Sequence, residues 1–445
     1  MYSTTVAAFV VAYFVPCLAF TPKECHDSIG PLALRFLSTK RPYTYQTSNP
    51  EIPIPQTCTP VKFWYFGRHG TRYPGDDDIL AMMDTLTPLH TEISNSINNS
   101  LLCEHTRMYL LSWRLGSDVN LLNESHLHEQ GKGELQAIGA RYKSRYPDLF
   151  TDQFSNDTHY FRATDAERTV SSLKAFASSA FSNTSSFWFP NPIKNDPILK
   201  FYSVCEKWKE QVDNNGSSRV ELKKFLVSSF MNDTITRVSL RLGLARNLTV
   251  EEITIMYTNC AFETAWMNGT LAPWCVAFGV EDFQVLAYTE DLEYYHVDGY
   301  GSPVNWESAC VVLQDAANFL GEYEANPRNP GRNVQAYFSH SGATLKFLAR
   351  LGLFNGTEIN ADNFDNVKDS YVWRTSDIDC MGSNIAFVLL QCEDENDLKL
   401  GVLFQEQLVN VFDLQGPYVD YHQFKNKIQP ILNTCDFQQI CDVDA

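Results

Sequence analysis

The sequence predicts an α/β fold in which a mostly parallel central sheet is flanked by helices and carries an inserted, mainly helical cap. Apolar runs of strand length alternate with amphipathic helices towards both ends of the chain. Between them, residues 185–325 form a longer, more irregular and helix-leaning stretch. With 445 residues, of which 44% are hydrophobic, the chain is long enough to bury such a core.

The first half of the core is predicted over residues 20–184. The near-continuous apolar run at 61–66 is typical of a central strand that is buried on both faces. Apolar residues at helical spacing predict a helix over 131–146, and a second strand follows at 158–161. The sequence T-D-A-E at 164–167 then fits a capping box, which predicts the start of another helix.

The second half of the core is predicted over residues 326–445. A strand at 334–338 is followed by a helix with leucines at helical spacing, which ends at Gly352. Further apolar runs at 385–390 and 402–404 predict two late strands. The chain thus returns to the sheet after the cap.

The first residues of the chain, 1–19, are predicted to be a secretory signal. An apolar stretch from Val6 to Val15 precedes small residues that suit cleavage after Ala19. This stretch is too short to cross a bilayer, and no later segment is long and apolar enough to be a membrane anchor. We therefore expect a secreted protein.

Glycosylation sequons and cysteines agree with export. Twelve cysteines occur, and the eleven beyond the predicted signal include no close C-x-x-C pair, which favours disulfides over zinc. An odd number implies one free thiol or a bond to another chain. The acceptor sequons for N-glycosylation are Asn98, Asn123, Asn156, Asn183, Asn215, Asn232, Asn247, Asn268 and Asn355.

The overall charge limits the classes of partner. A formal net charge of −18 argues against general affinity for nucleic acid or for anionic membranes. A basic cluster inside such a chain is therefore local, and it needs its own explanation.

The strongest such cluster is R-H-G-T-R-Y-P at 68–74, directly after the apolar run. Arg68, His69 and Arg72 would emerge at the carboxyl end of a central strand, where α/β sheets bind ligands. Arginine suits phosphate oxygens, and a neutral histidine between two arginines can attack phosphorus. The five specified residues would recur by chance on the order of once in a million positions. A basic surface turn is the weaker alternative.

This heptapeptide resembles the signature of the histidine acid phosphatases, and its T-R-Y-P form resembles the inositol polyphosphate phosphatases among them. Similar stretches occur at 127–131, 205–208, 271–275 and 302–303, so that the resemblance spans most of the chain. It implies a histidine-phosphatase core with a helical cap. It also implies a small-molecule phosphate ester as substrate, with no metal or cofactor.

The resemblance assigns roles to individual residues. His69 would be the nucleophile that becomes phosphohistidine, and Arg68 and Arg72 would hold the phosphoryl oxygens. Arg162 in F-R-A-T-D matches the third clamp arginine, with a surface charge at a helix start as the alternative. His340, after the strand at 334–338, matches the second histidine of the site. The resemblance also implies the disulfides Cys58–Cys392 and Cys260–Cys275.

One feature departs from the family pattern. After the second histidine the family carries an acid, in H-D or H-A-E, whereas this chain has Ser341 and Gly342. General acid catalysis contributes on the order of a hundred- to ten-thousandfold, and neither residue is an adequate acid. A donor from another loop, a good leaving group, slow turnover and no turnover all remain open. The acidic run at 76–78 is one candidate, although such a run is more often a solvated turn, and no donor is assigned.

Substrate selection is the least determined part. A polyphosphate needs cations beyond the clamp, and Lys207 and Lys209 in the predicted cap are candidates, with exposed helix lysines as the alternative. The leading hypothesis is a secreted phosphomonoesterase that acts on inositol polyphosphates. A secreted binder of anionic small molecules without turnover is the second, and a general acid phosphatase is the third.

Overall fold

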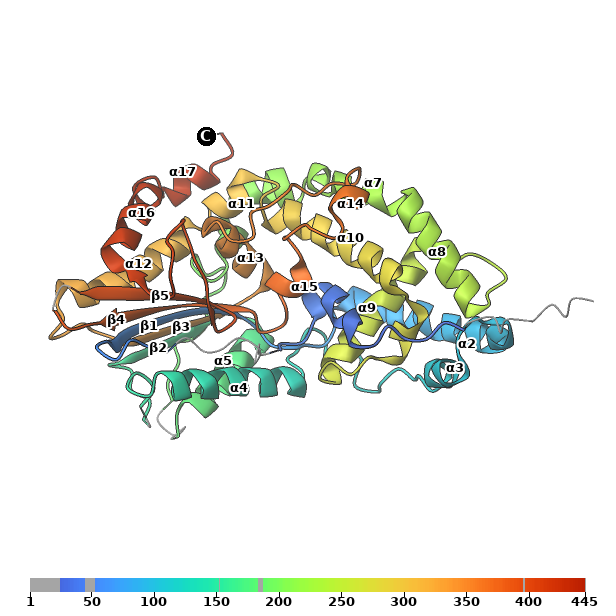
Figure 1. Ribbon diagram of the computed structural model, residues 1–445, viewed down its shortest axis with the longest axis horizontal. Coiled ribbons are helices and arrows are strands. Elements are labelled where there is room, and N and C mark those ends of the chain that lie inside the picture. The colour runs from blue at the N-terminus through green and yellow to red at the C-terminus, as the bar shows by residue number, and fades with distance from the viewer. Residues whose placement is uncertain (1–24, 45–52, 152, 183–186, 395–396, 445) are drawn as a thin grey trace, which may run out of the picture.

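The computed structural model describes residues 25–44, 53–151, 153–182, 187–394 and 397–444 (Figure 1). The predicted signal at 1–19 and the sequon at Asn183 lie outside the described residues. Within these ranges, a β-sheet flanked by helices lies beside a body made of helices (Figure 1).

The sheet has the strand order β2-β3-β1-β4-β5-β6, and β7 pairs with β5. Every strand predicted from the sequence is present. The strands are β1 (Thr59–Arg68), β2 (His159–Ala163), β3 (Val334–Ser339), β4 (Asn384–Gln391), β5 (Leu398–Phe404), β6 (Gln407–Leu408) and β7 (Val419–Asp420).

Strand directions confirm a mostly parallel sheet. β3 pairs in parallel with both β1 and β2, while β4 is antiparallel to β1 and to β5. Four of the five longer strands in the described residues therefore point the same way. The register pairs Arg68 with Ser339, so that β1 and β3 end side by side. The residues that follow these two ends must lie close together.

One face of the sheet is covered by α4 (Glu129–Arg145) and α5 (Glu167–Ala180), which pack on each other (Figure 1). Phe63 and Tyr65 point to this face because side chains alternate along a strand. Both rings are buried, and Tyr65 contacts Phe176 of α5 with ring centroids 5.2 Å apart. These aromatic contacts form the core on this side of the sheet.

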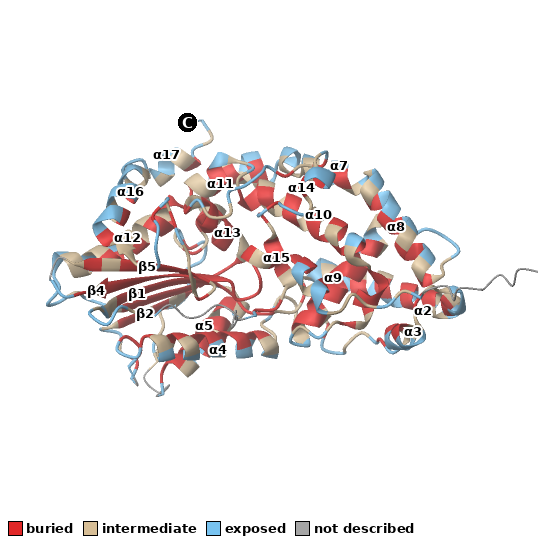
Figure 2. Ribbon diagram, in the orientation of Figure 1, coloured by how far each residue is buried: buried red, intermediate tan, exposed pale blue. Residues whose placement is uncertain are grey.

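The opposite face is covered by α12 (Cys310–Ala325), α13 (Ser341–Arg350) and α16 (Tyr421–Asn433) (Figure 1). Trp64 and Phe66, the alternate residues of β1, point to these helices and are fully buried. Figure 2 shows β1 and its neighbours buried along their lengths, whereas the outer helices are buried on one side only. A strand covered on both faces explains the near-continuous apolar run at 61–66.

The helical body lies beyond the carboxyl ends of β1 and β3 (Figure 1). Helices that precede β2 in the chain and helices that follow it both contribute to this body. Helix α12, at the end of the predicted cap, packs on the sheet instead. The division into core and cap stays a prediction. The remaining α-helices are α1 (Asp76–Ala81), α2 (Thr87–Ser96), α3 (Glu104–Leu111), α6 (Glu206–Trp208), α7 (Val220–Leu226), α8 (Ser229–Leu242), α9 (Val250–Trp266), α10 (Val280–Asp298), α11 (Pro303–Glu307), α14 (Phe364–Val367), α15 (Thr375–Ile378) and α17 (Phe437–Cys441).

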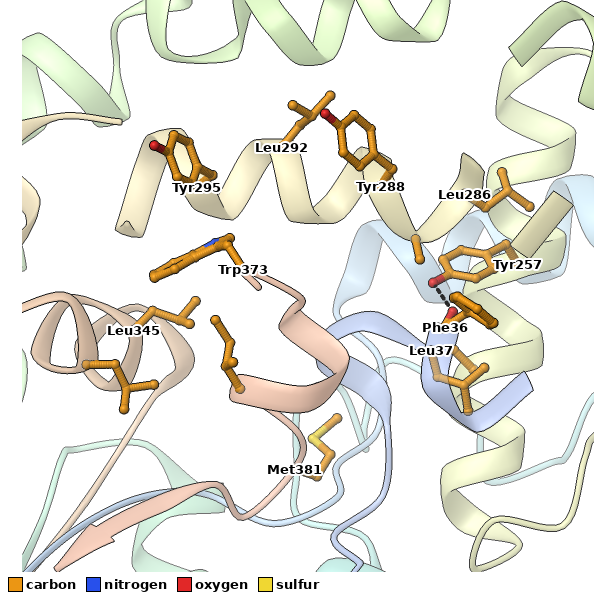
Figure 3. Packing of buried hydrophobic residues seen from close by; sticks show 14 of the residues in the cluster. Phe36, Leu37, Tyr257, Leu286, Tyr288, Leu292, Tyr295, Leu345, Trp373 and Met381 are labelled. Atoms are coloured by element: carbon orange, nitrogen blue, oxygen red, sulfur yellow. Dashed lines mark hydrogen bonds between the residues drawn. The ribbon is translucent and has the colours of Figure 1, made fainter. Parts of the chain in front are cut away.

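Helix α10 joins the helical body to α13, one of the helices that cover the sheet. Tyr288, Leu292 and Tyr295 lie along it, and the ring centroid of Tyr295 is 6.0 Å from that of Trp373 (Figure 3). At its other end, Tyr257 of α9 donates a hydrogen bond of 2.6 Å to the carbonyl oxygen of Phe36 (Figure 3). This packing holds the last turn of α10 near the start of α13.

Disulfides link distant parts of the chain. Both pairings implied by the resemblance, Cys58–Cys392 and Cys260–Cys275, are confirmed. The odd cysteine is Cys380, a buried free thiol. The other disulfides in the described residues are Cys25–Cys103, Cys205–Cys441 and Cys310–Cys435.

Candidate active site

The R-H-G loop leaves the end of β1 and is held by its backbone. The N–H of His69 donates to the carbonyl oxygen of Ser339 at 3.0 Å, and the N–H of Gly382 donates to the carbonyl oxygen of His69 at 2.9 Å. The loop is thus fixed between the end of β3 and the segment before β4.

Glycines allow this loop to pack directly on α4. A Cβ atom on Gly70 would lie 2.5 Å from the carbonyl oxygen of Gly131, and a Cβ on Gly131 would lie 2.1 Å from that of Thr71. Neither position has room for a side chain. The two glycines therefore allow a close approach of the loop to the first turn of α4.

The two histidines predicted for the site lie together. His69 follows β1, and His340 follows β3 as the N-cap residue of α13. Their ring centroids are 5.8 Å apart, and both residues are more than nine-tenths buried. The parallel pairing of β1 with β3 brings them together from distant parts of the chain.

His69 is held in the tautomer that a nucleophile needs. Its Nδ1 lies 2.8 Å from the carbonyl oxygen of Gly70, which can only accept, so Nδ1 carries the proton. The lone pair is therefore on Nε2, which has no hydrogen-bond partner in the described part of the chain. Burial, followed by the positive charges of Arg68 and Arg168, lowers the pKa of His69 well below its usual value. The ring stays neutral into acidic solution.

His340 is bonded through both ring nitrogens. Its Nδ1 lies 3.3 Å from Nη2 of Arg168, and because a guanidinium only donates, Nδ1 accepts. Nε2 then donates to Oγ1 of Thr164 at 2.9 Å. Burial and then the charges of Arg168 and Lys200 lower the pKa of His340 well below its usual value.

The predicted capping box at 164–167 is wrong. The N-cap residue of α5 is Ala166, and no side chain caps the helix. Oγ1 of Thr164 instead bonds Oγ1 of Thr169 at 2.8 Å and Nε2 of His340. The hydroxyl group of Thr164, which the sequence pattern assigned to a helix cap, therefore binds His340 instead.

Arg68 and Arg72 flank His69, as predicted, and each has backbone partners. Nη1 of Arg68 donates to the carbonyl oxygen of Thr39 at 2.7 Å and to that of Asp379. Nη1 of Arg72 donates to the carbonyl oxygen of Tyr73 at 2.7 Å. Burial, then the charges of Arg168 and Arg68, lower the pKa of Arg72 to about 10. Such crowding of cations is unfavourable without a bound anion.

Arg162, the predicted third arginine, does not join this group. Its Nη2 lies 2.7 Å from Oδ1 of Asp196, and its guanidinium lies over the ring of Tyr337, 5.1 Å from the centroid. Alternation along β2 explains this, because Phe161 and Ala163 point to the α4–α5 face and Arg162 points to the other. Arg162 therefore does not lie beside Arg68 and Arg72, where the sequence predicted it.

Arg168 occupies the place that was expected for Arg162. It lies in the first turn of α5, and its charge lowers the pKa of both His69 and His340. Buried Nε atoms of Arg68 and Arg168 have no hydrogen-bond partner in the described residues, which is unusual for buried polar groups. The sequence did contain a signal for Arg168, because a positive charge in the first turn of a helix is unfavourable next to the helix dipole.

Lys200, which the sequence did not single out, is a further cation whose charge lowers the pKa of His340. Lys207 lies on α6, and Lys209 forms an ion pair with Glu206 at 2.8 Å. A role for Lys207 in binding substrate stays a prediction.

The acidic run at 76–78 begins α1. Asp76 and Asp77 are exposed, whereas burial raises the pKa of Asp78, on which the charges of Lys40 and Arg72 act in the opposite direction. Its suggested role as proton donor stays a prediction.

Glu134 of α4 supports the signature loop. Its carboxyl group accepts hydrogen bonds from the N–H and from Oγ1 of Thr71, both at 2.8 Å. It also accepts a bond of 3.3 Å from the N–H of Tyr43. Burial raises the pKa of Glu134 to about 7. The same carboxyl thus positions the loop and titrates near neutral pH.

We expect Glu134→Gln to flatten the pH dependence of stability. The folded state favours the protonated carboxyl, so the wild type should lose stability as pH rises from about 4.5 through about 7. The loss assigned to Glu134 is on the order of 3 kcal/mol, because one pKa unit corresponds to about 1.4 kcal/mol. Urea unfolding of both proteins at several pH values measures this difference. Equal slopes for the two proteins would contradict the assignment.

Comparisons with known proteins agree with this geometry. A model of the histidine phosphatase superfamily (branch 2) matches residues 67–405. Multiple inositol polyphosphate phosphatase 1 of Drosophila melanogaster is 33% identical over 359 residues, which cover 79% of this chain and 74% of that protein. The family model and this relative both match most of the chain and agree on the family.

Solved structures agree on the fold. The phytase from D. castellii aligns with a TM-score of 0.74 at 15% identity, over 92% of this chain and 87% of that one. The multiple inositol polyphosphate phosphatase of Bifidobacterium longum, in complex with inositol hexasulfate, aligns with a TM-score of 0.67 at 15% identity, over 88% and 97%. The chain therefore belongs to the histidine phosphatase superfamily, branch 2, and its relatives named above are phosphoric monoester hydrolases.

Proposed function

We propose that the protein hydrolyses phosphate monoesters of inositol polyphosphates in two steps at His69. The observation that carries the proposal is a neutral imidazole, with its lone pair on Nε2, beside three guanidinium groups. Acid phosphatases that pass through phosphohistidine need this combination, because cations offset the repulsion between a nucleophile and an anionic ester.

In the first step, Nε2 of His69 attacks phosphorus and the bond to the leaving oxygen breaks. Arg68, Arg72 and Arg168 hold the phosphoryl oxygens as charge shifts in the transition state. The one N–H of His340 is bonded to Thr164. Its ring therefore acts by holding Arg168 in position and by contributing to the local electric field. In the second step, water attacks the phosphohistidine, releases phosphate and restores the lone pair on Nε2.

Two facts support a polyphosphate as the substrate. Lys200 adds a further positive charge on the His340 side of the clamp, which suits an ester carrying more than one phosphate. Two of the relatives described above are named multiple inositol polyphosphate phosphatases. The chain as a whole carries a charge of −18, and a cluster of cations inside such an acidic protein focuses the local field on anions.

The proposal places the enzyme outside the cell. Five disulfides join the described segments, and such bonds persist in oxidising compartments. In the described ranges, no helix combines the length and apolarity needed to cross a bilayer. The predicted signal at 1–19 and the sequons support the same location.

A second candidate is a secreted binder that holds anions without turnover. It is favoured by one observation, which is that Ser341 and Gly342 replace the acid of the family motif. The binder would keep the cations of the clamp but could not protonate a leaving group.

Phosphate release separates the two candidates. We expect the glycosylated, disulfide-bonded protein to release phosphate from inositol hexakisphosphate at acidic pH, and 4-nitrophenyl phosphate serves as the comparison. Faster turnover of the inositol ester at equal concentration supports the proposed substrate, and preference for the aryl ester indicates a general acid phosphatase. Tight binding of inositol hexakisphosphate by calorimetry, with no release from either ester, would establish the binder.

A further inference from the structure

We propose that Ser341 and Asp379 form a proton relay to the leaving oxygen, in which the Ser341 hydroxyl protonates the ester oxygen and Asp379 restores the proton. This inference rests on the proposed function. It supplies the general acid that the sequence after His340 lacks.

The relay is a direct contact. Ser341 is the first residue of α13, next to His340, and is partly exposed. Its Oγ is hydrogen-bonded to Oδ2 of Asp379, which follows α15 and is fully buried. Serine alone is too weak an acid, but here its oxygen is backed by a carboxyl group. Ser341 is accessible from solvent, whereas the buried Asp379 can act on a ligand only through it.

The carboxyl group of Asp379 also contacts Arg68, one of the three arginines proposed to hold the phosphoryl oxygens. Oδ2 of Asp379 lies 3.4 Å from Nη1 of Arg68, which also donates to the backbone oxygen of Asp379. Asp379 therefore links the guanidinium beside His69 to the hydroxyl beside His340. A proton held here is close to both halves of the site.

The surroundings of Asp379 allow it to hold a proton in mildly acidic solution. Burial raises the pKa of Asp379 to about 6, although the charge of Arg68 and the bond from Ser341 act in the opposite direction. The negative charge of Asp298, at the end of α10, adds to the rise, and the neighbouring Cys380 is a neutral thiol. Oδ1 of Asp379 is buried and accepts no hydrogen bond from the described residues, so the carboxylate form is poorly stabilised, while Oδ2, which contacts Ser341, can carry the proton.

Asp298 is the competing donor, because it fills the space beside Gly342. A Cβ atom on Gly342 would lie 3.0 Å from Oδ1 of Asp298. That carboxylate is the ion-pair partner of Lys346, whose side chain is fully buried and whose Nζ lies 4.3 Å from the ring centroid of Trp208. Protonation of Asp298 would leave a buried ammonium without a counter-ion, which is costly. Asp379 also faces a buried cation, but its Oδ2 lies 3.4 Å from Nη1 of Arg68, and that guanidinium keeps two backbone carbonyl oxygens as acceptors when Asp379 is protonated.

The step balances. As Nε2 of His69 bonds to phosphorus, the leaving oxygen takes the hydroxyl proton of Ser341 and keeps the electrons of the broken P–O bond. The Ser341 oxygen takes the proton of Asp379, which becomes a carboxylate. In the second step, water attacks phosphorus, its proton returns through Ser341 to Asp379, and the P–N bond electrons return to Nε2.

The test compares leaving groups in Ser341→Ala and Asp379→Asn. The 4-nitrophenolate anion leaves readily without a proton, whereas an inositol alkoxide does not. We expect kcat on inositol hexakisphosphate to fall by about a hundredfold or more, the scale of general acid catalysis, and kcat on 4-nitrophenyl phosphate to fall far less. Asp379→Asn should also remove the loss of kcat on the inositol ester as pH rises through about 6. Ser341→Thr keeps the hydroxyl group and should retain most of the wild-type activity.

Asp291→Asn is the matched control. Asp291 is also fully buried and accepts hydrogen bonds from Tyr371 and Thr375, and burial raises its pKa to about 6. It touches neither Arg68 nor Ser341, so any effect of its replacement should be equal on both esters. Ser341→Ala, at a partly exposed position, keeps the test available if Asp379→Asn fails to fold.

Three outcomes would overturn the relay. Equal losses on the two esters in Ser341→Ala and Asp379→Asn would show that the pair is only structural. A selective loss on the inositol ester in Asp298→Asn, but not in Asp379→Asn, would make Asp298 the donor. Absence of release from both esters by the wild type would reject the proposed function, and the relay with it.

Discussion

Replacing His69 with alanine is expected to lower phosphate release by roughly four to six orders of magnitude, as when a nucleophile or its base is removed from a serine protease. The variant has no atom that can bond to phosphorus. Arg68, Arg72 and Arg168 remain, so inorganic phosphate should still bind. Rapid-quench experiments should find labelled phosphohistidine in the wild type and none in His69→Ala.

Two further variants make this result specific. His69→Asn keeps a donor that can reach the carbonyl oxygen of Gly70 and so preserves the loop, yet it should be as inactive as His69→Ala. His422, an exposed histidine that lies 3.4 Å from Glu324 on the far side of the sheet from α4, serves as a control, and His422→Ala should be fully active. Substantial turnover by His69→Ala would reject His69 as the nucleophile.

Replacing Arg168 with alanine should lower kcat/KM by about a hundred- to a thousandfold, the cost of removing one donor to a developing oxyanion. Its guanidinium bonds His340 and repels the other clamp arginines, which is tolerable only if it serves an anion. Arg168→Lys should recover little, because an ammonium lacks the planar fork that matches two phosphate oxygens. Steady-state kinetics on both esters measures these effects.

Arg162→Ala is the matched comparison, because Arg162 is the arginine that the sequence predicted for the place that Arg168 occupies. It should change kcat/KM far less than Arg168→Ala, but it should destabilise the fold by about 3–5 kcal/mol, because it leaves Asp196 buried and unpaired. Thermal unfolding reports this loss. If Arg162→Ala lost more catalytic efficiency than Arg168→Ala at equal folded fraction, the assignment of the third arginine would be reversed.

Most of the fold was accessible from the sequence. The run at 61–66 predicted β1, and the apolar pattern at 334–338 predicted β3, because a strand buried on both faces cannot carry the polar alternation of a surface strand. The positive φ of 74° at Gly352 agrees with its predicted place after the helix. Patterns of this kind depend on neighbouring residues only.

The candidate site was only partly accessible. Arg68, His69 and Arg72 lie within five positions at the end of one strand, so their proximity needed no tertiary information. Distinguishing Arg162 from Arg168 did need tertiary information, because it depends on which face of β2 a side chain points to and on how α5 meets His340. Thr164 was misassigned for the same reason.

By itself, the sequence determined the alternation of strands and helices, the heptapeptide at the end of β1 and the absence of a family acid after His340. Only the tertiary structure decided that Arg168 and Lys200 act on His340, and that Asp379 lies behind Ser341. The physical reason is that hydrophobic periodicity and backbone preference are local. Contacts between charged groups depend instead on strand order, register and helix packing, which bring together residues far apart in the chain.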